Sequence, residues 1–384
     1  MIGEHLTDDR GELRRAGRLP KLLPPWLAAL LGLMMAAGIA AFLGLLGQGE
    51  TTRAWQIFLI NFLYWPGMAV AGVAWAAIFE VTRARWPVGV RRLAETCAAC
   101  LPLAFLIFLV SWLGRFTLFP WARHPNPSIQ AWLNLPFLYG RETVGLLLLF
   151  GSSLLFVYRP GRALQKLGVS LLIIYGVVYT IFSWDFAMSI QPGWFSTMFG
   201  ALFFVENLYL GLAAVTALAV VARRRDDWSN RLGPTSFNNL GKLLLAFSLL
   251  WIYLFGAQYL VIWYGNLPHE ISFILARTES DSWKMLAFVM LVLLFVTPFL
   301  VLLSPAARKS PQILLAMAVA ILAGMWLERY LLVVPALSPG SQFSLNWQEL
   351  TITAGFFASF ALAYLFSLAM IPRSVRSRDD AASR

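Results

Sequence analysis

Long apolar stretches alternate with short polar connections along almost the whole chain. Most of the stretches have the ~17–25 residues that a helix needs to cross a hydrocarbon core about 30 Å thick. The pattern therefore predicts ten transmembrane helices. They are Trp26–Gly47, Trp55–Phe79, Cys97–Leu118, Thr143–Tyr158, Leu167–Trp184, Ser196–Ala222, Leu240–Tyr264, Trp283–Leu303, Pro311–Val334 and Thr351–Ile371.

Basic residues are unevenly shared between the polar connections. Of the 30 Lys and Arg residues, 23 lie in the two tails and near the connections that follow helices two, four, six and eight. Six lie on the opposite side, and Arg329 lies inside the ninth helix. Because basic residues are retained on the cytoplasmic side, both termini are expected to be cytoplasmic. This predicts cytoplasmic tails at residues 1–25 and 372–384 and a membrane domain at 26–371.

The composition supports a membrane protein and removes a competing class. With 59% hydrophobic and 13% charged residues, the 384-residue chain is too apolar for a soluble domain. Its net charge of +11 would favour nucleic-acid binding in a soluble protein. Here the charge lies in tails and loops, such as Arg223 to Arg225, where it orients helices and meets anionic lipid. We therefore expect the bilayer, and no nucleic acid, as a partner.

A weak internal repeat runs through the chain at an offset near 145 residues. Asp185 is followed seven residues later by Pro192, and Glu328 is followed seven residues later by Pro335. The offset predicts an all-α fold of two four-helix bundles in parallel orientation, with helices two to five at 55–187 and six to nine at 196–334. Helices one and ten are then peripheral. Inverted repeats, common in ion-coupled transporters, need an odd number of helices per unit, so they are disfavoured.

Polar residues inside the predicted helices are the candidates for chemistry, because charges in hydrocarbon are costly and usually functional. Glu328 and Arg329 are adjacent and point ~100° apart, so we expect them to pair with other helices and not with each other. Glu206 has no basic residue near it in sequence and is expected to be a lone carboxyl, suited to a proton relay. The alternative is that these groups only hold helices together. The proton-path candidates are Asp185, Glu206, Glu328 and Arg329, and Asn61, Asn207 and Gln258 are uncharged additions.

Histidine and cysteine limit the cofactors that the chain can hold. The only histidines, His5, His124 and His269, lie outside the predicted helices. A transmembrane haem b needs axial ligands, usually His, from the helices. Cys97 and Cys100 form a C-x-x-C pair near the start of an apolar helix, where packing is the expected role. We therefore expect no haem and no iron–sulfur cluster bound by this chain.

The longest connection on the non-cytoplasmic side runs from Phe119 to Glu142 and is rich in Trp and Pro. Such a composition predicts a structured cap at the membrane surface and not a flexible loop. Aromatic residues contribute disproportionately to binding between proteins. Trp121, His124 and Trp132 are therefore candidates for docking a partner subunit.

Two long motifs carry a resemblance to a known family. They are Phe182-Ser-Trp-Asp-Phe-Ala-Met-Ser-Ile-Gln-Pro-Gly-Trp-Phe-Ser-Thr-Met198 and Phe255-Gly-Ala-Gln-Tyr-Leu-Val-Ile-Trp-Tyr-Gly-Asn-Leu-Pro-His-Glu270. The chain resembles the F subunits of bacterial alternative complex III, which belong to the polysulfide-reductase-like (NrfD-like) membrane proteins. The resemblance covers helices two to nine.

The resemblance implies a subunit of a quinol:cytochrome c, or quinol:high-potential acceptor, oxidoreductase in a respiratory chain. The location implied is the bacterial cytoplasmic (inner) membrane. The implied partners are a sister ten-helix subunit that oxidises quinol near the outer face, an iron–sulfur subunit and c-type cytochrome subunits.

The role of this chain inside such a complex is left open by its residues. Asp185 is the candidate base for quinol, and His269 and Glu270 join the polar groups of a candidate quinone site. A proton-conducting or scaffolding role is equally compatible with the residues. Two further alternatives are a proton-coupled transporter that uses Glu206, Asp185 and Glu328, and a purely structural membrane anchor.

Overall fold

The computed structural model describes residues 24–158, 164–224, 228, 231–266 and 268–370, and in these residues it contains helices and no strand. Ten of the helical segments described are long and apolar enough to cross a membrane. Within the described residues, the ten predicted spans are thereby confirmed. Ten apolar helices indicate a multi-pass membrane protein. The predicted tails lie outside the described residues, apart from Pro24 and Pro25.

The helices follow one another with short connections. The first half contains α2 (Pro25–Gly47), α3 (Thr51–Val81), α4 (Val88–Thr96), α5 (Leu101–Ser111), α6 (Arg115–Leu118), α7 (Leu135–Tyr158) and α8 (Leu164–Ser183), and a π-helical turn, η4 (Trp184–Met188), extends α8. The second half contains α9 (Phe199–Arg223), α11 (Pro234–Gly265), α12 (Pro268–Thr278), α13 (Asp281–Leu291), α14 (Thr297–Leu302), α15 (Pro305–Lys309), α16 (Pro311–Leu337) and α17 (Trp347–Met370). The short turns are η1 (Cys97–Cys100), η2 (Trp112–Gly114), η3 (Pro120–Ala122) and the π-helical η5 (Val292–Val296).

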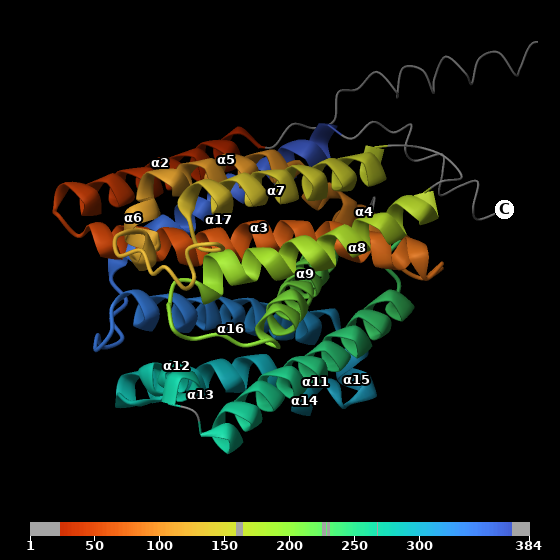
Figure 1. Ribbon diagram of the computed structural model, residues 1–384. Helices are drawn as coiled ribbons and strands as arrows, with labels where there is room; N and C mark the ends of the chain where they lie inside the picture. Colours follow the sequence, from red (N-terminus) through yellow and green to blue (C-terminus); the bar gives the residue numbers. More distant parts are fainter. Residues whose placement is uncertain (1–23, 159–163, 225–227, 229–230, 267, 371–384) are drawn as a thin grey trace, which may run out of the picture.

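Helices α3 and α9 form the centre of the molecule. Helix α3 packs against α8, α9 and α16, and α9 packs against α11 and α16 as well (Figure 1). Small residues let the two central helices approach closely: a Cβ added to Gly211 of α9 would lie 2.6 Å from the Cβ of Ala71 of α3. Such contacts between small residues are a main source of helix association in membranes.

Helices α2 and α17 pair with each other at one edge of the molecule (Figure 1). A Cβ on Gly38 would lie 2.8 Å from the Cα of Gly355, so neither glycine tolerates a side chain without separating the helices. Polar contacts attach α17 to α3. Arg53 Nε donates to Glu349 Oε1 at 2.7 Å, and Asn61 Nδ2 donates to Thr353 Oγ1 at 3.0 Å.

Helices α11 to α15 lie at the opposite edge from α2 (Figure 1). The sequence pattern gave only a connection between the seventh and eighth spans, but the structure has α12 there, packed against α13 and α16. Arg277 and Phe273, one turn apart on this helix, both line a pocket described below. Helix α12 is therefore held in place by contacts with other helices, and a hydropathy pattern does not show such contacts.

One predicted helix boundary is wrong in a way that matters for the site. The fourth span was expected to begin at Thr143, after the charged pair Arg141 and Glu142, but α7 begins at Leu135 and includes both residues. The two charges do not end the helix, because Arg141 pairs with Asp185 on the neighbouring η4 turn. The interior ion pair replaces water as the partner of the guanidinium.

Candidate functional site

A buried ion-pair cluster joins α9 and α16, and we call Glu206, Glu328 and Arg329 the Arg329 cluster. Arg329 Nη1 donates to Glu206 Oε2 at 2.9 Å and lies 2.6 Å from Glu328 Oε2. Trp251 Nε1 of α11 donates to the other Glu206 oxygen at 3.3 Å. The Arg329 side chain is fully buried, with its guanidinium carbon 4.2 Å from the centre of the Phe203 ring.

Two expectations about this cluster are corrected. Glu328 and Arg329 were expected not to pair with each other, yet their charged atoms are in contact. Their Cα–Cβ bonds diverge, but both side chains are long enough to bend toward one point. The contact between Arg329 Nη1 and Glu328 Oε2 is an ion pair and lacks the geometry of a hydrogen bond. Glu206 is also not a lone carboxyl, because its partner comes from α16, 123 residues further along the chain.

A second buried cluster lies in the first half of the chain, and we call Arg141, Glu142 and Asp185 the Arg141 cluster. Arg141 Nε and Nη2 donate to the two oxygens of Asp185, each at 2.5 Å. Asp185 has no exposed surface and lies in the π-helical η4 turn, a type of helix distortion found often at functional sites. Trp132 Nε1 also donates to Asp185 at 3.1 Å, and Trp132 is stacked under the Arg141 guanidinium. Asp185 is thus a fully partnered carboxylate and not a free base.

Glu142 was not among the predicted site residues, although it is one of the most buried acids in the molecule. Its side chain is 1% exposed, and neither carboxyl oxygen has a hydrogen-bond partner in the described structure. Its charge lies close enough to interact with that of Asp185. A sequence signal did exist: Arg141-Glu142 is an adjacent basic–acidic pair, as is Glu328-Arg329.

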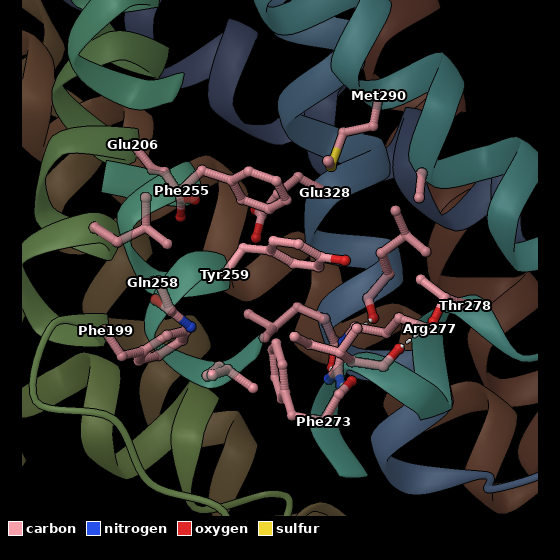
Figure 2. A pocket seen from close by; sticks show the side chains of 16 residues that line it. Phe199, Glu206, Phe255, Gln258, Tyr259, Phe273, Arg277, Thr278, Met290 and Glu328 are labelled. Carbon is pink, nitrogen blue, oxygen red and sulfur yellow. Dashed lines mark hydrogen bonds between the residues drawn. The ribbon is translucent and has the colours of Figure 1, made fainter. Parts of the chain in front are cut away.

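A pocket of about 290 Å³ opens beside the Arg329 cluster. Its wall is mostly apolar and aromatic, with few polar groups. Figure 2 shows Glu328 and Tyr259 pointing toward its centre, with Gln258 and Arg277 at its edges. The lining residues belong to α9, α11, α12, α13 and α16, and the polar or aromatic ones are Phe199, Glu206, Phe255, Gln258, Tyr259, Phe273, Arg277, Thr278 and Glu328.

Arg277 is a second residue that sequence reasoning missed, since it was counted only as a charge in a connection. Its Nε and Nη2 donate to the carbonyl oxygens of Leu331 and Leu332 at 2.9 and 2.8 Å. The Leu331 carbonyl needs a donor from outside α16, because the residue four positions later is Pro335, which has no N–H. Burial lowers the pKa of Arg277 to about 9, against the opposing effect of Glu328, so the guanidinium stays charged at neutral pH.

The uncharged candidates separate into distinct environments. Asn61 is fully occupied, since it donates to Ile57 and Thr353 and accepts from Trp65 Nε1 at 3.0 Å. Asn207 donates to the Phe203 carbonyl, while its own oxygen lies against Gly67 without a hydrogen-bond partner in the described structure. Gln258 lines the pocket, with its oxygen likewise unpartnered among the described residues.

Two candidates from the second motif lie in the first turn of α12. Glu270 is partly exposed and does not line the pocket, and the side chain of His269 is outside the part of the structure that is described. The structure therefore brings Glu206, Glu328 and Gln258 together at one pocket and leaves Glu270 apart from it.

The predicted cap between α6 and α7 consists of the η3 turn followed by irregular turns. His124 is exposed at its surface. Trp121, in contrast, is 5% exposed and packs against Phe119, so it does not present a docking surface. Trp132 is 41% exposed and also supports the Arg141 cluster, so it joins that cluster to the surface of the cap.

Within the described residues, no group of three or more His, Cys, Asp or Glu side chains could hold a metal ion. Cys97 and Cys100 are free and buried, and Cys97 packs against Gly72 of α3, which agrees with a packing role. In the comparisons with known proteins, no family model and no curated protein matches the chain. The resemblance to alternative complex III subunits therefore stays a prediction based on two sequence motifs.

Proposed function

We propose that this chain is a membrane subunit of a quinol:cytochrome c (or high-potential acceptor) oxidoreductase, and that the pocket beside the Arg329 cluster receives a quinol headgroup. The observation that carries the proposal is the pocket itself. Apolar and aromatic walls suit a lipid-soluble ring, and a few placed polar groups are what orients a ligand in such a site.

The polar groups match the needs of quinol oxidation. A quinol must lose the protons of its two hydroxyl groups when its electrons leave, so a site needs an acceptor near each oxygen. The Glu328 carboxyl reaches into the pocket, and the Gln258 amide lines its edge, where it is the polar group for the second ligand oxygen. Glu206, held by Arg329 behind Glu328, supplies a second carboxyl that can take up a proton.

The electrons must leave the chain, because its donor groups do not suit a redox centre. The spans contain no His for a haem, and their two Cys side chains are buried packing groups. We propose that an iron–sulfur subunit and c-type cytochrome subunits accept the electrons at the face that carries the α6–α7 cap. A sister ten-helix subunit would lie beside this chain in the bilayer.

The finer architecture and topology belong to the same proposal. We propose that α3 to α8 and α9 to α16 are two parallel four-helix repeats, with α2 and α17 peripheral. The pairing of α2 with α17 outside the central helices supports this division. The charge asymmetry favours cytoplasmic termini in a bacterial inner membrane, which would place the cap and α12 on the outer side.

A pocket-filling substitution tests the quinol site. Ala287 lines the pocket and Ala316 lies on the exposed face of α16, so Ala287→Phe and its matched control Ala316→Phe add the same ring in different places. In the purified complex, Ala287→Phe should lower the bound quinone and raise the KM for quinol about tenfold, equivalent to ~1.4 kcal/mol. Ala316→Phe should change neither quantity.

Two results would count against the proposal. Wild-type quinone content and KM in the assembled Ala287→Phe complex would show that the headgroup binds elsewhere. Substrate-driven proton uptake by the isolated chain in liposomes would favour the proton-coupled transporter instead. The same buried carboxyls would then serve proton coupling.

A further inference from the structure

The two buried clusters have the same chemical composition. Each consists of two carboxyl groups and one arginine, and in each the arginine is adjacent in sequence to a glutamate. With both acids ionised, each cluster carries a formal charge of −1 and becomes neutral when it takes up a single proton. When one cluster is protonated and the other is not, moving the proton from the first to the second exchanges the two charge states, so the total charge of the pair does not change.

Several polar atoms of the two clusters, and of α8 and α9, are buried without a hydrogen-bond partner in the described structure. They are both oxygens of Glu142, the Tyr175 hydroxyl, Asn207 Oδ1, and Nε and Nη2 of Arg329. Proteins leave few such groups unpaired, because each costs about 1–3 kcal/mol. Groups of this kind in a polar interior are commonly satisfied by ordered water.

Together with Tyr179, these atoms come from four helices, α7, α8, α9 and α16. We call the five residues the polar seam: Glu142, Tyr175, Tyr179, Asn207 and Arg329. Tyr179 of α8 lies within electrostatic range of Glu142 on α7 and of Arg329 on α16. The rings of Tyr175 and Tyr179 are 4.9 Å apart.

Gly67 of α3 leaves the space for the middle of the seam. A Cβ there would lie 2.1 Å from Asn207 Oδ1 and 3.7 Å from the Tyr179 hydroxyl. The two oxygens thus face the same point, close enough for one water molecule to bridge them.

We propose that ordered water fills the polar seam and that protons pass through it between the Arg329 cluster and Glu142. In the step, a protonated carboxyl of the Arg329 cluster gives its proton to the seam water, and the water at the other end gives one to the Glu142 carboxylate. Asp185 accepts from Arg141 at both of its oxygens and positions that guanidinium. The proton leaves Glu142 at the Trp132 side, where the cap meets solvent.

In the quinol enzyme proposed above, this route would carry a substrate proton from the pocket to the surface of the cap. That use rests on the proposed function, but the seam itself does not. Its water and its carboxyl groups can be measured in the full chain without quinol.

Infrared difference spectroscopy during a pH titration tests the seam, using the full chain in nanodiscs with its native partners. The wild-type protein should show water bands that shift in H₂¹⁸O and a buried carboxyl band that disappears in Glu142→Gln. Tyr179→Phe leaves the carboxyl groups of both clusters in place and should slow proton exchange at Glu142 about tenfold. Glu349→Gln and Tyr364→Phe are matched controls on α17, and neither should change these bands.

Absence of isotope-sensitive water bands in the wild-type protein would overturn the proposal, whatever the variants do. So would an unchanged carboxyl band in Glu142→Gln, or unchanged exchange in Tyr179→Phe. Loss of quinone binding in Ala287→Phe with intact seam bands would support both proposals. Intact seam bands in a protein that binds no quinone would retain the seam and remove only the quinol site.

Discussion

Arg277 and Pro335 should be energetically coupled, because the arginine supplies the hydrogen bond that the proline cannot. Arg277→Met removes the donor to the Leu331 carbonyl, and with Pro335 in place that carbonyl has no other helical donor. Leaving it unpaired costs about 1–3 kcal/mol. In a Pro335→Ala background the new N–H can pair with the same carbonyl, so this part of the cost disappears.

The two substitutions should therefore show a coupling energy of about 2 kcal/mol in a double-mutant cycle. Burying the guanidinium has its own cost, which Arg277→Met relieves, but that relief is the same in both backgrounds and cancels in the cycle. The free energy of unfolding would be measured by denaturant titration in mixed micelles. A second cycle with Pro66→Ala, on α3, should be additive within about 0.5 kcal/mol. Equal costs of Arg277→Met with Pro335 and with Ala at that position would refute the reasoning.

Four further outcomes are expected. Asp185→Asn should lower the free energy of unfolding by about 3 kcal/mol, because it breaks a buried two-point ion pair. Glu206→Gln should lower it less, since Arg329 keeps Glu328 as a partner. The reverse order in unfolding titrations would contradict this. Glu206→Gln should also slow quinol-linked turnover of the assembled complex, which a stopped-flow assay would detect. Tags at Met1 and Arg384 should both report cytoplasm, while a tag within Asn126–Gln130 should report the outside. The chain purified without partners should show no stoichiometric haem band in its absorption spectrum.

The ten spans could be predicted because hydrophobic length is a property of each segment by itself. The boundary at Thr143 was wrong because Arg141 was judged without its partner, and that partner lies on another helix. The same limit affected Glu206, whose cation is 123 residues away. Burial of a charge in a membrane depends on tertiary pairing, and a single sequence does not show which helices pair.

The site was found in part for the same reason. Glu206, Glu328 and Gln258 stand out as polar residues in apolar runs, and the structure does bring them to one pocket. Glu142 was missed because it lies next to a predicted helix end, and Arg277 because it lies in a predicted connection; charged residues are ordinary in both places. Pro335 is inside α16 in the structure, although the predicted ninth helix ended at Val334. A proline inside a helix leaves a carbonyl that needs a donor, so the need for Arg277 appeared only with the true end of the helix.

The close pairing of α2 with α17 has a consequence for how the protein is made. The partner that covers most of the buried stripe of α2 is the last helix of the described chain to leave the ribosome. Until α17 is inserted, Gly38 of α2 faces lipid or an insertion chaperone. Eight other spans are inserted between α2 and α17. A chain whose translation stops before Gly355 would have an α2 helix without its packing partner. We expect membrane proteases to degrade such a chain. Docking of α2 in its final place therefore depends on the synthesis of α17.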